Sequence, residues 1–220
     1  MKFTRDKIRE SMLLYAVTDR AWLKENESLK DVVEEVLKNG ATFLQIREKD
    51  LPEERFESES EELKALCAKY EVPFVVNDSV EIAMECDADG VHVGQSDIKG
   101  RDIRAMIGVD KILGISAGTV EEAVAAEKAG ADYIGVGAVF GTSTKKNART
   151  MSMELLKEIC ESVSIPVVAI GGIGMKNIDQ LAGSGVDGVA VVSAIFAAEN
   201  PGNATKELLE LSKNMVRAHG

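Results

Sequence analysis

The feature that most constrains the fold is an alternation of short apolar runs with amphipathic segments along the whole chain. Eight pairs follow one another, and each pair predicts a strand followed by a helix. In chain order, the expected strand and helix ranges are 12–18 with 28–39, 43–48 with 52–70, 73–77 with 80–86, 90–94 with 100–107, 112–116 with 120–129, 132–140 with 152–163, 166–171 with 176–184, and 188–195 with 204–218. Because strands that alternate with helices pair in parallel, this order predicts an α/β fold.

The spacing of apolar residues supports both kinds of element. In the 28–39 segment the apolar residues fall at intervals of 3, 1, 3 and 1, which places them on one stripe of a helix. Gly40, Gly130 and Gly185 each follow such a pattern, where glycine is typical of a helix end. The run 189–192 is apolar throughout, as expected for a strand buried on both faces of a parallel sheet.

An internal repeat selects the architecture. Similar short stretches open every second expected strand, and the strand starts at Phe43, Gly90, Tyr133 and Gly188 are 47, 43 and 55 residues apart. A repeat of two strand–helix units around a ring predicts a single TIM (β/α)8 barrel over residues 1–220. The alternative is an open doubly wound sheet. It would want a G-x-G-x-x-G turn after the first strand, where this chain has Thr18-Asp19-Arg20.

The composition limits the kinds of molecule that the chain is expected to bind. The 220 residues include 26 Lys and Arg against 37 Asp and Glu, a net charge of −11, which argues against a nucleic-acid or anionic membrane surface. No apolar run approaches the ~20 residues of a membrane span, and the charged start of the chain is unlike a signal peptide. The three scattered cysteines predict reduced thiols. We therefore expect a cytoplasmic protein that acts on small molecules; whether it forms a homo-oligomer stays open.

Polar residues after the second expected strand predict an anion site. Active sites of these barrels lie at the carboxyl ends of the strands. Alternation along a strand sends Gln45, Arg47 and Lys49 to one side, toward the barrel interior or mouth if Leu44 and Ile46 face the helices. Two cations and an amide at that mouth would suit a phosphate ligand in an otherwise acidic protein. The alternative is a solvated loop or an ion pair with Glu48.

Two carboxylates at the next strand ends predict a metal site. Asp78 follows Asn77 after the third expected strand, and Asp97 follows the fourth. Mg²⁺ typically takes one or two carboxylates together with substrate phosphate oxygens and water, so this pair suits Mg²⁺ bound to a diphosphate. The alternative for each aspartate is a helix N-cap.

The later strand ends add small and hydroxyl-bearing residues. Ser116 ends the fifth strand, and the glycine-rich 171–174 segment and Ser193 follow the seventh and eighth, where these barrels often cradle phosphate. The loop after the sixth strand contains Thr142, Ser143, Thr144 and Lys145, which could close over a substrate or be an ordinary turn. His92, inside the fourth strand, is expected to be a hydrogen-bonded histidine of the core or mouth rather than a catalytic base.

Taken together, these motifs resemble the thiamine-phosphate synthase family, whose members join the pyrimidine and thiazole halves of thiamine. The resemblance covers nearly the whole chain. It rests on Gln45-Ile-Arg-Glu-Lys49, Asn77-Asp78, Gly90-Val-His-Val-Gly-Gln95 with Asp97, Thr142-Ser-Thr-Lys145 and Ile170-Gly-Gly-Ile173.

The resemblance implies two substrate sites and a metal ion. Hydroxymethylpyrimidine diphosphate would be held by Gln45, Arg47, Lys49 and Asn77, with Ser116 and Lys145 on the departing diphosphate. Thiazole phosphate would be held by Thr142, Ser143, Thr144, Gly172, Val192 and Ser193. Asp78 and Asp97 would bind Mg²⁺, and the catalytic groups would be Arg47, Lys49, Lys145 and Ser116. The implied reaction is dissociative: diphosphate leaves first and the thiazole nitrogen then attacks.

Three positions depart from the family pattern, and two other functions stay open. Ser79 stands where members often have Arg, Gly118 where they often have His, and Gly141 where they often have Pro. A thiazole tautomerase on the same barrel would need an acid–base group near Gly118, which glycine cannot supply. A non-catalytic phosphate-binding barrel is the other alternative.

Overall fold

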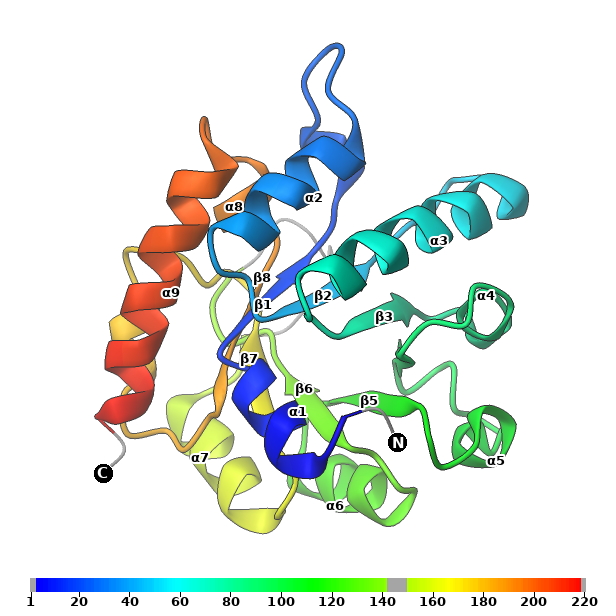
Figure 1. The fold of residues 1–220 in the computed structure, drawn as a ribbon. Helices are drawn as coiled ribbons and strands as arrows, with labels where there is room; N and C mark the ends of the chain where they lie inside the picture. Colours follow the sequence, from blue (N-terminus) through cyan, green and yellow to red (C-terminus); the bar gives the residue numbers. More distant parts are fainter. Residues whose placement is uncertain (1–2, 142–149, 219–220) are drawn as a thin grey trace.

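A computed structural model of the chain describes residues 3–141 and 150–218 and contains a closed barrel of eight parallel strands (Figure 1). The strands are β1 (Leu14–Val17), β2 (Phe43–Ile46), β3 (Phe74–Asn77), β4 (Gly90–Val93), β5 (Ile112–Ala117), β6 (Tyr133–Val136), β7 (Val167–Ile170) and β8 (Gly188–Val191). Each pairs with its neighbour in sequence, and β1 closes the ring on β8 with Tyr15 opposite Ala190. This closure confirms the TIM barrel and excludes the open sheet.

Helices surround the barrel and follow the predicted order. They are α2 (Leu29–Lys38), α3 (Glu53–Lys69), α4 (Val80–Glu85), α5 (Ile103–Ile107), α6 (Val120–Lys128), α7 (Met153–Ser162) and α9 (Pro201–Arg217). In α2 all five apolar residues of the predicted stripe are buried, each worth about 1.5–3 kcal/mol of transfer free energy. None of the helices in the part of the chain described is long and apolar enough to cross a membrane.

Seven of the eight strands are shorter than predicted, two of them by four or more residues, and one predicted helix has a different geometry. The expected strand 188–195 ends at Val191, and α8 (Ser193–Phe196) follows it; a continuous apolar run does not distinguish strand from buried helix. The expected strand 132–140 ends at Val136, and the next residue, Gly137, lies so close to β7 that a Cβ there would be 2.0 Å from the Ile170 carbonyl oxygen. The expected helix 176–184 is the 3₁₀ helix η2 (Ile178–Leu181).

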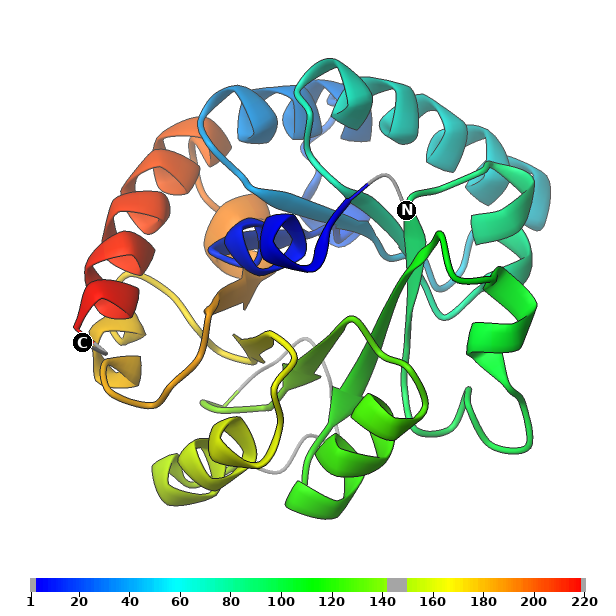
Figure 2. The same cartoon turned by 60° about the horizontal axis from the view of Figure 1, so that its bottom comes forward.

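A further helix that the sequence pattern did not predict closes the amino-terminal end of the barrel. Helix α1 (Arg5–Ser11) begins at Thr4, whose side chain accepts a hydrogen bond from the Lys7 amide. Its residue Ile8, with Met12 and Phe3, joins the apolar cluster inside the barrel. In Figure 2 this helix lies across the middle of the ring of helices. Ligands are therefore expected at the opposite, carboxyl ends of the strands.

Alternation along each strand divides the core into an outer and an inner layer. Leu44 and Ile46 pack outward in the larger cluster with the helices, whereas Phe43 packs inward with Tyr15 and Tyr133. Gln45, between them in β2, consequently faces the interior, and it is 5% exposed.

Candidate active site

A cavity of about 560 Å³ lies at the carboxyl ends of the strands and takes its lining from every strand or the segment that follows it. The expected site residues that line it are Gln45, Arg47, Asn77, Ser116, Gly172, Val192 and Ser193. Segments as far apart as β2 and the turn after β8 therefore contribute to one site, as the barrel topology predicted. Thr142, Ser143, Thr144 and Lys145 lie outside the described residues.

The β2–β4 side of the cavity carries the charge. Gln45 and Arg47 line it from β2 and the residues just after it, and Asn77 lines it from β3. The Arg47 amide donates to the Thr18 hydroxyl at 3.0 Å, which ties the end of β2 to the end of β1. Lys49, in contrast, is exposed and does not line the cavity, because regular strand geometry ends at Ile46. Its role in binding stays a prediction.

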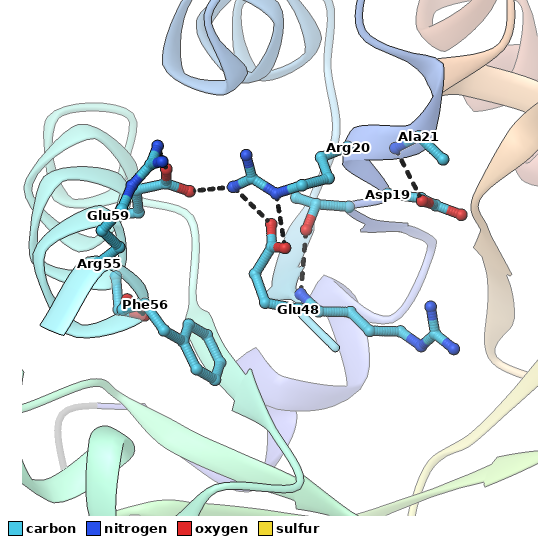
Figure 3. Close-up of polar contacts among 10 residues, drawn as sticks. Asp19, Arg20, Ala21, Glu48, Arg55, Phe56 and Glu59 are labelled. Carbon is cyan, nitrogen blue, oxygen red and sulfur yellow. Dashed lines mark hydrogen bonds and ion pairs between the residues drawn. The ribbon is translucent and has the colours of Figure 1, made fainter. Parts of the chain in front are cut away.

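Glu48 points away from the cavity lining and is held by Arg20 (Figure 3). The Arg20 guanidinium donates to both Glu48 carboxylate oxygens, at 2.7 and 3.0 Å, and also bonds to Glu59 of α3. The Glu48 side chain is 3% exposed, so this pair is largely shielded from water. Glu48 thus forms an ion pair with Arg20 of η1 (Arg20–Trp22) rather than with Arg47 or Lys49.

Asp78 and Asp97 face each other beside this charged wall. Partial burial, and then the nearby charge of Asp97, hold the pKa of Asp78 above its usual range, while the charge of Arg47 acts in the opposite direction. Asp78 also has a φ of +64°, a left-handed conformation that is uncommon outside glycine and asparagine and is often found at functional positions. Neither aspartate is a helix cap: Ser79 caps α4 and Asp102 caps α5.

This carboxylate pair fits a divalent cation that a substrate helps to hold. Two aspartates close enough to raise a pKa repel each other, and a cation between them would relieve that repulsion. Over residues 3–141 and 150–218 no group of three or more His, Cys, Asp or Glu side chains could enclose a metal. Mg²⁺ commonly binds one or two carboxylates and completes its shell with phosphate oxygens and water.

The β6–β8 side of the cavity is formed by close-packed backbone. Gly171 and Gly172 have φ values of +103° and +66°. A Cβ on Gly172 would lie 2.3 Å from the Gly141 carbonyl oxygen, so a side chain there would displace the neighbouring loop. Ser193 completes this wall after β8. Glycine residues and Ser193 line the cavity here, and among the described residues that line this side there is no Lys or Arg.

A buried row of polar side chains forms the floor of the cavity. Tyr15, Gln45, His92 and Ser116 line it, and Tyr133 lies beneath them with no exposed surface. Both ring nitrogens of His92 have hydrogen-bond partners, Tyr133 and Ser116, as expected for a hydrogen-bonded histidine. The sequence reasoning missed the two tyrosines. The same alternation that placed Gln45 inward also places Tyr15 and Tyr133 inward, so the signal was present in their strands.

The three departures from the family pattern have simple structural roles. Ser79 caps α4 by accepting from the Ile82 amide, and Gly141 lies against Gly172. Gly118 lines the cavity, and its amide donates to Glu122 at 2.7 Å. Position 118 therefore has no side chain that could exchange a proton with a ligand.

Sequence comparison identifies the family. The sequence model described as thiamine monophosphate synthase matches residues 14–195. The chain belongs to this family. A thiamine-phosphate synthase of Clostridium beijerinckii is 49% identical over 195 residues, covering 89% of this chain and 93% of the relative. The corresponding protein of Methanobrevibacter smithii is 47% identical over 197 residues, covering 90% and 93%.

Solved structures agree with this assignment. Thiamine phosphate pyrophosphorylase from Pyrococcus furiosus superimposes with a TM-score of 0.86 at 39% identity, covering 94% of this chain and 98% of that one. A geranylgeranylglyceryl phosphate synthase from Thermoplasma acidophilum, at 16% identity and a TM-score of 0.70, shares the fold alone. This thiamine monophosphate synthase family member is accordingly an enzyme, a transferase of thiamine biosynthesis that acts on small molecules.

Proposed function

We propose that the enzyme condenses 4-amino-2-methyl-5-hydroxymethylpyrimidine diphosphate with thiazole phosphate to give thiamine phosphate and diphosphate. If the carboxylated thiazole phosphate is the substrate, its carboxylate would leave as CO₂ and a proton would take its place. The observation that carries this proposal is the division of one cavity into two sides. Arg47 lines the charged side, with Asp78 and Asp97 near it but outside the cavity lining, and Gly171 and Gly172 line the glycine-rich side. Such a cavity suits two phosphorylated substrates that require different kinds of anion binding.

The charged side would bind the pyrimidine diphosphate. Gln45 and Asn77 would hold the aminopyrimidine ring, because their amides can pair with its amine and ring nitrogens. Arg47, with Lys49 and Lys145, would neutralise the diphosphate as it leaves, and Ser116 would donate a hydrogen bond to it. Charge developing on a leaving diphosphate is stabilised best by groups that are already in place, and β2 fixes Arg47 at the cavity wall.

Asp78 and Asp97 would hold Mg²⁺ on the same side. When bound, the ion would supply positive charge to the diphosphate oxygens. The raised pKa of Asp78 supports this assignment, since partial burial and then the nearby charge of Asp97 disfavour its ionised form, and a cation would offset both.

The glycine-rich side would hold the thiazole phosphate. Gly172, Val192 and Ser193 would contact its phosphate through backbone amides and a hydroxyl, and Thr142, Ser143 and Thr144 would add hydroxyls. The bond between the pyrimidine methylene carbon and the diphosphate oxygen would break first, and both electrons would leave with diphosphate. The thiazole nitrogen would then form the new C–N bond with its lone pair. With thiazole phosphate itself no proton is transferred, so no general base is needed; the two binding sites supply alignment.

The test is an endpoint assay with purified protein, both substrates and Mg²⁺, in which thiamine phosphate is oxidised to a fluorescent thiochrome. We expect product that disappears with EDTA and returns with excess Mg²⁺. Omission of each substrate in turn is the control for contaminating thiamine. Folded protein that binds thiazole phosphate but forms no product would contradict the proposal and favour a non-catalytic barrel.

A further inference from the structure

Four consecutive hydrogen bonds cross the floor of the cavity from β2 to β5. The Gln45 amide nitrogen donates to the Tyr15 hydroxyl at 2.6 Å, and the Tyr15 and Tyr133 hydroxyls are 2.8 Å apart. The Tyr133 hydroxyl lies 2.9 Å from Nδ1 of His92, and Nε2 of His92 lies 3.0 Å from the Ser116 hydroxyl. The two ends, Gln45 and Ser116, are cavity-lining residues with proposed substrate contacts, whereas the three middle residues have no assigned role.

Counting hydrogens gives this row a direction. Burial raises the pKa of Tyr15 and of Tyr133 well above the usual tyrosine value, so each phenol keeps its one hydrogen at neutral pH. Tyr15 accepts from the Gln45 amide, so its own hydrogen is available for Tyr133. The Tyr133 hydrogen is then available for Nδ1 of His92.

The direction continues through the imidazole. A neutral imidazole whose Nδ1 accepts carries its hydrogen on Nε2. Nε2 then donates to the Ser116 oxygen, and the hydrogen of Ser116 is left to point elsewhere. At the other end, an amide that donates its NH₂ group to Tyr15 has its carbonyl oxygen available on the opposite side.

We propose that Tyr15, Tyr133 and His92 are positioning residues that fix which hydrogen-bonding group each end of the row presents to substrate. Gln45 presents a carbonyl oxygen, which accepts from the amine of an aminopyrimidine. Ser116 presents a hydroxyl hydrogen, which donates to a diphosphate oxygen. The identity of these two ligand groups rests on the proposed function, but the direction of the row does not.

Two glycines beside the row, Gly114 and Gly135, leave space for the side chains of Tyr133 and His92. A Cβ on Gly114 would lie 2.2 Å from Cζ of Tyr133 and 2.5 Å from Nδ1 of His92. A Cβ on Gly135 would lie 3.1 Å from Cε1 of His92. The next two strands around the barrel from His92, β5 and β6, therefore leave the space that the phenol and the imidazole need to meet.

A reversed row is the competing arrangement. If the Gln45 amide turned over, its oxygen would accept from Tyr15, and each later hydrogen would point back toward Gln45. His92 would then carry its hydrogen on Nδ1, and Ser116 would turn its hydrogen toward His92 and offer a lone pair to the diphosphate. A lone pair facing an anion is repulsive, so the two arrangements differ in function as well as in tautomer.

The tautomer can be measured without any substrate. The chain has two histidines, so ¹⁵N-labelled imidazole signals in the His219→Ala variant report His92 alone. At a pH where the ring is neutral, we expect Nε2 to carry the hydrogen and Nδ1 to have the shift of an unprotonated nitrogen. A hydrogen on Nδ1 would overturn the proposal, whether or not the protein makes thiamine phosphate.

Removing one link tests the functional consequence. Tyr133→Phe keeps the ring that packs on Phe43 and removes the central hydroxyl. We expect the Nε2–H tautomer to lose its predominance and the KM for the pyrimidine diphosphate to rise about tenfold, the cost of about one hydrogen bond. The KM for thiazole phosphate should change less than twofold.

Tyr70→Phe is the matched control, because the Tyr70 hydroxyl bonds to Glu34 on the outer helices. It should leave both KM values and the His92 signals unchanged. Equal increases in both KM values for Tyr133→Phe would indicate a general structural effect and overturn the positioning role. Absence of product from the wild-type chain would instead contradict the proposed function, while the tautomer measurement would still decide the direction of the row.

Discussion

The β2–β4 side and the β6–β8 side of the cavity differ in the means by which each can bind an anion. The first uses side-chain charge, with Arg47 at the wall and the Asp78–Asp97 pair beside it. The second uses backbone, because Gly171 and Gly172 have left-handed φ values and Gly172 leaves no room for a Cβ. Charge suits a group whose negative charge increases during the reaction, whereas backbone amides suit a phosphate that is only held.

Loss of charge on the β2–β4 side is expected to have the largest effect. Arg47→Ala should lower kcat about 10²–10³-fold, because the leaving diphosphate loses a preorganised cation, while the fold is retained. Asp78→Asn should lower turnover severely if, as proposed, Asp78 holds Mg²⁺. Arg55→Ala is the control, since that side chain is 66% exposed. Near-normal turnover in both site variants would remove this side from the mechanism.

A backbone change on the β6–β8 side should act on binding rather than on chemistry. In Gly172→Ala the new Cβ meets the Gly141 carbonyl at a φ of +66°, so we expect the KM for thiazole phosphate to rise about tenfold with kcat nearly unchanged. Gly183→Ala imposes similar backbone strain, at a φ of +77°, with no atom within 4 Å of the Cβ. It should lower stability without changing KM. A fall in kcat for Gly172→Ala would show that the two sides do not act separately.

The Arg20–Glu48 pair offers a further test of the charged side, because Glu48 follows Arg47 in the sequence and its ion pair holds this segment in place. Glu48→Gln removes a shielded charged hydrogen bond and should lower the free energy of unfolding by about 1–2 kcal/mol. The expected fall in Tm is roughly 4 °C. The KM for the pyrimidine diphosphate should rise about threefold, or about 0.7 kcal/mol, as the segment that carries Arg47 loosens. Glu62→Gln, in an exposed pair with Lys30, is the control. Unchanged Tm and KM would mean that the pair does not support the site.

The smallest expected effect is a gain in stability at the proposed metal site. The pKa of Asp78 is raised on folding, so its contribution to stability is present below the unfolded-state pKa and is lost as pH rises through the folded-state value. At neutral pH the ionised Asp78 therefore opposes folding. Asp78→Asn should raise Tm by about 1–2 °C without Mg²⁺, and added Mg²⁺ should raise Tm in the wild type more than in the variant. A lower Tm for Asp78→Asn at neutral pH, measured by calorimetry, would contradict this.

The barrel was predictable because its evidence is spread along the chain. Eight alternating segments and a repeat of two units gave the strand order, and the closed ring agrees. The short helix α8 was not predictable, since the largely apolar run 189–195 is compatible with both strand and helix. Nor was the 3₁₀ geometry of η2 predictable from its sequence pattern. Helix α1 was missed because its charged residues were interpreted only as evidence against a signal peptide.

The candidate site was partly predictable for a related reason. Residues at strand ends, such as Arg47 and Ser116, follow from the barrel geometry once the strands are known. The Tyr15–Tyr133–His92 contacts do not, because a tyrosine within an apolar run is normally assigned to the core. The contact between β1 and β6 across the interior exists only after the ring has closed.

The space at Gly114 also restricts the order in which this chain could change during evolution. Any side chain at position 114 would overlap the Tyr133 ring, even if that ring were phenylalanine, because the overlap involves Cζ. The same Cβ would also lie 2.5 Å from Nδ1 of His92, so both Tyr133 and His92 must be exchanged for smaller residues before alanine is accepted at position 114. In a combinatorial mutational library the three positions should show strong epistasis: alanine at position 114 is harmful on its own and tolerated only where both neighbouring side chains are smaller.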